Sequence, residues 1–209
     1  MHPGQIPSSP FDAGAAKTAL RDQLVTARNR RSLTEVGLAS AGLAGHLLRL
    51  PEVRRAASVA AYVAVGREPG TGLLLDALLD AGKRVILPLT VGRLSAGGLD
   101  LDWATYTGPD SLAPARFGLL EPTTPPLGLE AVATPDVVLV PGLAVSSTGH
   151  RLGKGAGCYD KALGRVPVGT FTCVLLYPEE VGIDVPVEPH DRPVLAAATP
   201  DGVTRLGAG

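Results

Sequence analysis

Aromatic side chains are scarce in this sequence of 209 residues. They make up 4% of the chain, with one Trp, four Tyr and three Phe, whereas hydrophobic residues as a whole make up 45%. The core must therefore be built largely from aliphatic residues. Charged residues amount to 19%, and this balance is typical of a folded globular protein rather than a disordered one.

The sequence also lacks an excess of charge of either sign. Its 19 basic and 20 acidic residues give a formal net charge of −1. Broad nucleic-acid binding needs a basic face that displaces counterions from the phosphates, and this composition argues against it. A near-zero net charge still allows a local positive pocket that binds a small anion. We therefore expect small molecules rather than nucleic acid as partners.

Long apolar runs and paired cysteines are absent too. No run approaches the roughly 20 residues of a membrane-spanning helix, and the N-terminus MHPGQIPSSPFDAG lacks the basic and apolar parts of a signal peptide. Cys158 and Cys173 have neither a disulfide-framework nor a zinc-site spacing. We therefore expect a cytoplasmic protein without membrane contact. Residues 1–14 are expected to form a flexible tail, and residues 15–209 a single domain.

Three helices are predicted in the first part of the chain. Apolar residues recur at helical spacing within residues 15–31. Ser32 and Glu35 fit a capping box that starts a second helix, and Pro51 ends it. Thr71 is expected to cap a third helix.

Buried strands are predicted in four apolar runs, which cover residues 58–65, 84–89, 136–142 and 171–177. A segment rich in Gly and Pro, residues 91–128, separates the second run from the third. It contains LDLDWATY and RFGLLEP, which we interpret as short strands of an excursion. Because apolar strands alternate with helices, we expect a mostly parallel sheet covered on both faces.

The segment RLGKGAGCYDKAL, residues 151–163, follows the strand predicted at residues 136–142. Three alternate glycines lie within it, Gly153, Gly155 and Gly157. Glycines let successive backbone N–H groups converge, and such a nest at a helix N-terminus favours an anion. Arg151 and Lys154 add positive charge that suits phosphate. Ligands of open α/β sheets bind beyond the carboxyl ends of the strands, so we expect a phosphate site here.

The glycine spacing is neither that of a P-loop nor that of the dinucleotide-binding fingerprint. Asp160 lies on the expected first turn of the following helix. A hard carboxylate beside phosphates can hold Mg²⁺. From the residues alone, a glycine-rich turn in which Asp160 merely caps the helix remains an open alternative.

This segment resembles the signature of the 5-formyltetrahydrofolate cyclo-ligase family, which runs roughly R-L-G-x-G-x-G-Y-Y-D-R-x-L. Further segments are similar in the family's order: K-x-x-L-R at residues 17–21, AAYVAVGREPGT, KRVILPL, RFGLLEP and EPHDRPV. The resemblance spans about residues 15–203. It implies a three-layer α/β/α fold with a mostly parallel sheet, Rossmann-like and of the NagB/RpiA/CoA-transferase-like kind.

The resemblance implies an ATP- and Mg²⁺-dependent conversion of 5-formyltetrahydrofolate to 5,10-methenyltetrahydrofolate, with release of ADP and phosphate. We expect the protein to be a monomer. In this reaction the formyl oxygen attacks the γ-phosphate, and the neighbouring folate nitrogen then displaces phosphate as the ring closes. Phosphoryl transfer depends on positioning and charge neutralisation rather than on a protein nucleophile.

The resemblance also implies residue roles. Arg151 and Lys154 are expected to be catalytic. ATP is expected to contact the first helix and the glycine loop: Lys17, Arg21, Arg151, Leu152, Gly153, Lys154, Gly155, Ala156, Gly157, Cys158 and Tyr159. The folate is expected to contact Val63, Glu68, Lys154, Gly155, Ala156, Gly157 and Cys158. Asp160 and Asp191 are the expected metal ligands.

Several of these residues also fit an interpretation without a role in binding or catalysis. Lys17 and Arg21 lie one helical turn apart and fit a solvated surface pair equally well. Glu68 fits a solvent-exposed pair with Arg67. Asp191 also fits a turn aspartate. Trp103 fits either a border of the folate site or a hydrophobic plug.

Cys158 departs from the family pattern, which usually has tyrosine there. The thiol fits either a small apolar contact or, at a helix N-terminus, a reactive group. Its presence calls folate affinity into question and permits a second function, a folate- or nucleotide-binding homologue with weak catalysis. A third function is another phosphate-using enzyme on the same fold.

Overall fold

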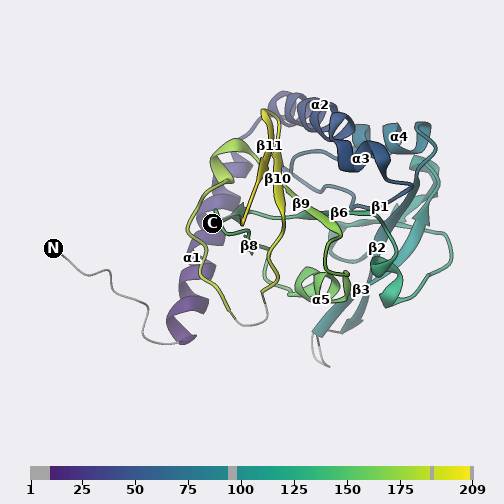
Figure 1. The fold of residues 1–209 in the computed structure, drawn as a ribbon. Helices are drawn as coiled ribbons and strands as arrows, with labels where there is room; N and C mark the ends of the chain where they lie inside the picture. The colour runs from purple at the N-terminus through teal and green to yellow at the C-terminus, as the bar shows by residue number, and fades with distance from the viewer. Residues whose placement is uncertain (1–9, 94–97, 189–190, 208–209) are drawn as a thin grey trace.

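A computed structural model describes residues 10–93, 98–188 and 191–207. Its main sheet has seven strands in the order β11-β10-β9-β6-β1-β2-β3 (Figure 1). These strands are β1 (Ser58–Ala60), β2 (Arg84–Arg93), β3 (Gly98–Tyr106), β6 (Val137–Pro141), β9 (Phe171–Leu175), β10 (Ala196–Thr199) and β11 (Gly202–Arg205). The five central strands are parallel, while the edge strands β3 and β11 are antiparallel to their neighbours. The expected mostly parallel sheet is thus confirmed.

Helices cover both faces of this sheet (Figure 1). The α-helices are α1 (Pro10–Asn29), α2 (Leu33–Arg49), α3 (Pro51–Arg55), α4 (Gly72–Asp80) and α5 (Cys158–Arg165). Short 3₁₀ helices are η1 (Pro109–Ser111), η2 (Arg116–Gly118), η3 (Leu129–Ala133) and η4 (Pro178–Glu180). Two small ribbons pair β4 (Leu112–Pro114) with β5 (Leu120–Pro122), and β7 (Ala144–Val145) with β8 (Arg151–Leu152).

Two apolar layers hold these elements together. Buried residues of α2, α3 and α4 pack on one face of the sheet, and those of α5 and η3 pack on the other. Helix α1 packs instead beside the β7–β8 ribbon, where Leu20 and Leu24 lie against a buried cluster that includes Ala144 and Leu152. The three-layer α/β/α architecture is therefore confirmed, and α1 is left beside the segment that follows β6.

The predicted capping box of α2 is present. The Ser32 hydroxyl accepts from the backbone N–H of Glu35 at 3.2 Å, and the Glu35 carboxylate accepts from the N–H of Ser32 at 2.7 Å. Both groups are local in sequence, so the pattern alone was enough to predict them. Helix α1 begins at Pro10, five residues earlier than expected, and residues 1–9 lie outside the described part of the chain.

Thr71 occupies the N-cap position of α4, as predicted, but its side chain makes no capping hydrogen bond. Its hydroxyl donates to the carbonyl of Tyr62 at 2.8 Å and accepts from the N–H of Ala64 at 2.9 Å. The side chain therefore closes the loop that follows β1. This loop leaves the sheet after Ala60, so β1 is five residues shorter than predicted.

The edge of the sheet also differs from the prediction. β2 continues to Arg93 and pairs with β3 in a long antiparallel hairpin, so LDLDWATY belongs to the main sheet. Trp103 on β3 is 0% exposed and lies in the core beneath α5. This position favours a hydrophobic packing role for Trp103 over a place at the border of the folate site. Among the described residues, no helix is both long and apolar enough to cross a membrane.

Candidate active site

A cavity of about 470 Å³ opens where β1 and β6 end. Its walls come from α1, the loop after β1, the β2–β3 hairpin, the η2–β5 segment, the glycine loop and the segment after Val187. The position at the carboxyl ends of parallel strands is the one expected for a ligand of an α/β sheet. Segments far apart in the sequence therefore meet at a single site.

The structure brings every predicted site residue to this cavity. The lining includes Lys17, Arg21, Val63, Glu68, Arg151, Leu152, Gly153, Lys154, Gly155, Ala156, Gly157, Cys158, Tyr159, Asp160 and Asp191. His190, quoted in the resemblance, lies outside the described residues.

Sequence reasoning missed most of the apolar half of the cavity. This half is lined by Leu99, Leu101, Phe117, Leu119 and Leu120. Leu99 and Leu101 alternate along β3, so a correct β2–β3 hairpin would have put both on one face. Phe117 is 58% exposed with φ of 60°, a region that non-glycine residues rarely adopt.

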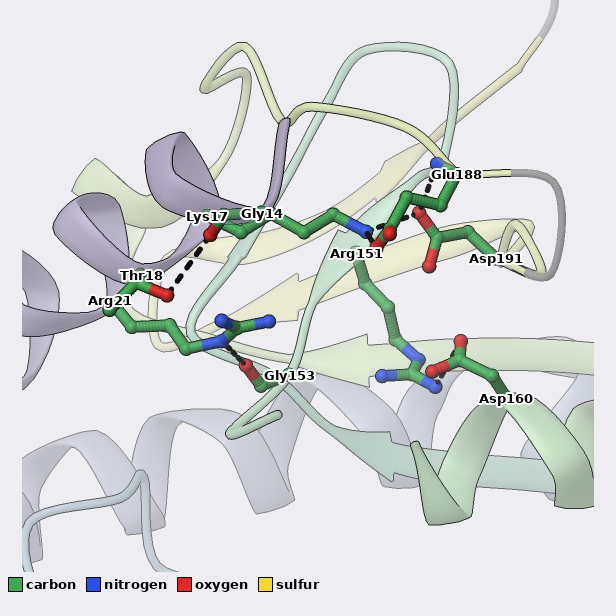
Figure 2. Close-up of polar contacts among 9 residues, drawn as sticks. All are labelled: Gly14, Lys17, Thr18, Arg21, Arg151, Gly153, Asp160, Glu188 and Asp191. Carbon is green, nitrogen blue, oxygen red and sulfur yellow. Dashed lines mark hydrogen bonds and ion pairs between the residues drawn. The ribbon is translucent and has the colours of Figure 1, made fainter. Parts of the chain in front are cut away.

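Helix α1 presents two cations to the cavity (Figure 2). The Lys17 ammonium lies 2.6 Å from Glu188 Oε2 and 2.7 Å from Asp191 Oδ2. The Arg21 Nε donates to the carbonyl of Gly153 at 2.9 Å. Lys17 is only 4% exposed, so the interpretation as a solvated surface residue is wrong for it. Burial acts to lower the pKa of Lys17, but Asp191 and Glu188 outweigh burial and raise that pKa, which keeps the amine charged.

The glycine loop begins in the β7–β8 ribbon and ends at the first turn of α5. Gly155 and Gly157 have φ of 101° and 69°, values that favour glycine. A Cβ at Gly155 would lie 3.4 Å from Cζ of Arg21, so the loop backbone approaches that guanidinium closely. The missing side chains therefore open this stretch of backbone to the cavity.

Arg151 is buried, with 6% of its surface exposed, and its Nη2 donates to Asp160 Oδ1 at 2.9 Å (Figure 2). Burial lowers the pKa of Arg151, and the Asp160 carboxylate opposes that shift. The Nε of Arg151 is buried and has no hydrogen-bond partner among the described residues. A buried donor without a partner is costly, so this guanidinium is suited to an anionic ligand.

Lys154 reaches across the cavity to the loop after β1. Its ammonium lies 2.7 Å from Glu68 Oε1, and Glu68 Oε2 accepts from the N–H of Val65 at 2.9 Å. Glu68 is 7% exposed, so the alternative interpretation, a solvent-exposed pair with Arg67, is wrong. The Lys154–Glu68 pair joins the glycine loop to the wall that carries Val63.

Cys158 lines the cavity at the start of α5 and is 9% exposed. Burial raises the pKa of its thiol, despite the opposing charge of Lys161. A raised pKa lowers the thiolate fraction, so the structure favours the small apolar contact over the reactive group.

Asp160 and Asp191 are the expected metal ligands. Figure 2 shows Asp160 paired with Arg151 and Asp191 paired with Lys17. The described residues contain no cluster of three or more His, Cys, Asp or Glu that could hold a metal ion by itself. Mg²⁺ commonly takes one or two carboxylates and fills its shell with water and phosphate oxygens. The two aspartates therefore fit a metal that arrives with a phosphate compound.

The fold and cavity together define a class of protein: an α/β enzyme whose site joins a cationic, glycine-lined end to an apolar end. The model of the 5-formyltetrahydrofolate cyclo-ligase family matches residues 13–200. The chain belongs to this family.

Known proteins agree with that assignment. The 5-formyltetrahydrofolate cyclo-ligase of Mycolicibacterium smegmatis is 43% identical over 190 residues, which cover 88% of this chain and 94% of the relative. The Escherichia coli K12 enzyme of the same name is 31% identical over 185 residues, with coverages of 84% and 97%.

Solved structures agree as well. The NMR structure of Aquifex aeolicus 5,10-methenyltetrahydrofolate synthetase superimposes with a TM-score of 0.77 at 29% identity and covers 92% of this chain and 94% of its own. A 5,10-methenyltetrahydrofolate synthetase from Mycoplasma pneumoniae, 17% identical with a TM-score of 0.68, supports the fold.

Proposed function

We propose that the chain converts 5-formyltetrahydrofolate to 5,10-methenyltetrahydrofolate, with consumption of ATP and release of ADP and phosphate, and that Mg²⁺ is required. One observation carries this proposal: the cations of α1 and of the glycine loop converge on one cavity whose other half is apolar. A triphosphate and a flat reduced folate need these two environments side by side.

The cationic end is proposed to bind ATP through Lys17, Arg21, Arg151, Lys154 and the backbone from Leu152 to Tyr159. In the structure Lys17 and Arg151 are paired with the carboxylates of Asp191 and Asp160. When ATP and Mg²⁺ are bound, Lys17 and Arg151 would turn to the phosphates, and Asp160 and Asp191 would hold the metal. The metal would neutralise charge on the phosphates.

The apolar end is proposed to bind the folate. Leu101 and Phe117 offer surfaces for the ring system, and Val63 lines the same cavity. Glu68 offers a buried carboxylate that can accept from pterin N–H groups. The segment from Gly155 to Cys158 lines the same cavity and is proposed to contact both substrates. Binding in this way would bring the formyl group toward the γ-phosphate.

The chemistry follows from that placement. The formyl oxygen attacks the γ-phosphorus, the bond to ADP breaks, and the oxygen becomes part of a good leaving group. The neighbouring folate nitrogen then attacks the activated carbon, loses its proton, and phosphate leaves with the original formyl oxygen. Lys154 and Arg151 neutralise the charge that develops on the transferred phosphoryl group.

The proposal is tested by the ultraviolet absorbance of the methenyl product. Purified protein with ATP, Mg²⁺ and 5-formyltetrahydrofolate should form this product with one ADP for each folate, and omission of ATP should abolish it. Folate binding without ADP release in a single turnover would contradict the proposal and support a binding homologue.

Replacement of Cys158 by tyrosine is expected to lower the KM for 5-formyltetrahydrofolate, because the ring restores apolar contact at a position that lines the cavity. The gain should be about 2–10-fold, the range for one additional aromatic contact. Steady-state kinetics at saturating ATP measures it. A higher KM would mean that the pocket has adapted to the smaller thiol.

A further inference from the structure

A buried ion pair lies outside the cavity and joins two distant segments. Arg28 on α1 is 4% exposed and Glu180 at the end of η4 is 2% exposed. The Nε and Nη2 of Arg28 donate to the two oxygens of Glu180, each at 2.7 Å. Neither residue is among those that line the cavity. A bidentate pair of this kind has a fixed geometry, so it locks α1 to η4.

This pair is connected to the wall of the cavity. Arg28 Nη2 also donates to the carbonyl of Gly142 at 2.7 Å, and Gly142 lines the cavity where β6 ends. Glu180 Oε2 accepts from the backbone N–H of Tyr177 at 2.9 Å. Tyr177 is 1% exposed, and the guanidinium carbon of Arg31 lies 3.8 Å from the centre of its ring. The tyrosine is therefore held from its backbone and from its ring face.

The hydroxyl of Tyr177 is the contact that reaches the folate side of the site. It donates to the carbonyl of Arg67 at 3.0 Å. Arg67 directly precedes Glu68, whose N–H donates to the carbonyl of Val65 at 3.2 Å and whose carboxylate accepts from the N–H of Val65. Residues 65–68 thus form a closed turn, and Tyr177 anchors that turn to the β9 side of the molecule.

We propose that Tyr177 is a positioning residue for Glu68 and thereby sets the affinity for the folate. The inference rests on the proposed function, because it assumes that Glu68 contacts the folate. A carboxylate that must meet fixed N–H groups binds well only when its loop is held in place before the ligand arrives. Glu180 holds the backbone of Tyr177 and Arg31 lies over its ring, so this residue links the position of η4 to the loop.

The test is the Tyr177→Phe variant, which removes one hydroxyl and leaves the buried ring. We expect the KM for 5-formyltetrahydrofolate to rise about 2–10-fold, the effect of one hydrogen bond. The KM for ATP should stay within a factor of about two, because the hydroxyl touches no residue of the phosphate side.

The matched control is Tyr106→Phe. Tyr106 is 3% exposed, its hydroxyl donates to Asp76 Oδ1 at 3.1 Å, and it does not line the cavity. It should lose a similar amount of thermal stability and keep both KM values of the unmodified enzyme.

A double-mutant cycle with Glu68→Gln separates a positioning effect on Glu68 from a nonspecific destabilisation of the protein. If Tyr177 acts through Glu68, then Tyr177→Phe should add little to the folate KM once Glu68 is replaced. Additive effects, or an unchanged folate KM in an active Tyr177→Phe enzyme, would overturn the inference alone. An unmodified enzyme that forms no methenyl product would overturn the proposed function and this inference with it.

Discussion

Replacing Lys154 by methionine is expected to lower kcat/KM by about 10²–10³-fold, the cost of removing one group that stabilises transition-state charge. The Lys154 side chain is 55% exposed and belongs to the glycine loop, so its ammonium can leave Glu68 and turn to a phosphate. Phosphoryl transfer spreads negative charge over the transferred group, and a compact cation at that point lowers the barrier directly.

Steady-state kinetics with varied ATP measures this loss, and Lys83→Met is the control. Lys83 donates to the backbone carbonyls of Arg54 and Ala56, away from the cavity. The control should keep the activity of the unmodified enzyme. A Lys154→Met enzyme with the same kcat/KM as the control would contradict the catalytic role of this lysine.

Replacing Asp160 by asparagine is expected to raise the Mg²⁺ concentration for half-maximal activity by about 10–100-fold, a range seen even for residues that only support metal ligands. Asparagine keeps the shape and one acceptor oxygen, so the contact with Arg151 can persist in part. The loss of charge weakens the hold on a divalent cation. Activity measured across a Mg²⁺ titration gives the shift.

Asp100→Asn is the matched control for this variant. Asp100 accepts two hydrogen bonds from Arg165, at 2.9 and 2.7 Å, and Arg165 lies on α5, as Asp160 does. Both changes therefore remove an aspartate from an arginine pair, and only Asp160 lines the cavity. If Asp160→Asn lowers kcat without moving the Mg²⁺ dependence, the residue acts through Arg151 and is not a metal ligand.

The parts of the fold that were predictable from sequence are those set by local or one-dimensional patterns. The capping box of α2 joins Ser32 to Glu35, three residues away. β6 and β9 are buried along almost their whole length, so a continuous apolar run identifies them. The alternation of such strands with helices then fixes the parallel sheet.

Features that depend on distant partners were not predictable. Thr71 stands at the N-cap position of α4, yet its hydroxyl closes the loop after β1, because Tyr62 offers a carbonyl acceptor there and Ala64 an N–H donor. The full β2–β3 hairpin requires the pairing register of two strands, which the Gly-rich sequence around residues 91–98 does not specify.

In the candidate site too, many of the residues could be predicted from the sequence, whereas contacts between distant segments could not. The resemblance supplied most of the charged residues and the glycine loop that meet at the cavity, but neither the ion pairs among them nor most of the apolar lining. Lys17 binds Glu188 across 171 residues of sequence, and Glu188 was not predicted at all. The contact of Tyr177 with Arg67 has no local signal, because it depends on how η4 packs beside the loop after β1.

Calorimetric titration of the purified protein with ATP, with and without Mg²⁺, tests the central claim most directly. The account predicts that one nucleotide binds per chain, that Mg²⁺ strengthens this binding, and that Lys154→Met weakens it. A folded protein that takes up no nucleotide in the presence of Mg²⁺ would contradict the claim that the glycine loop and its cations hold a triphosphate.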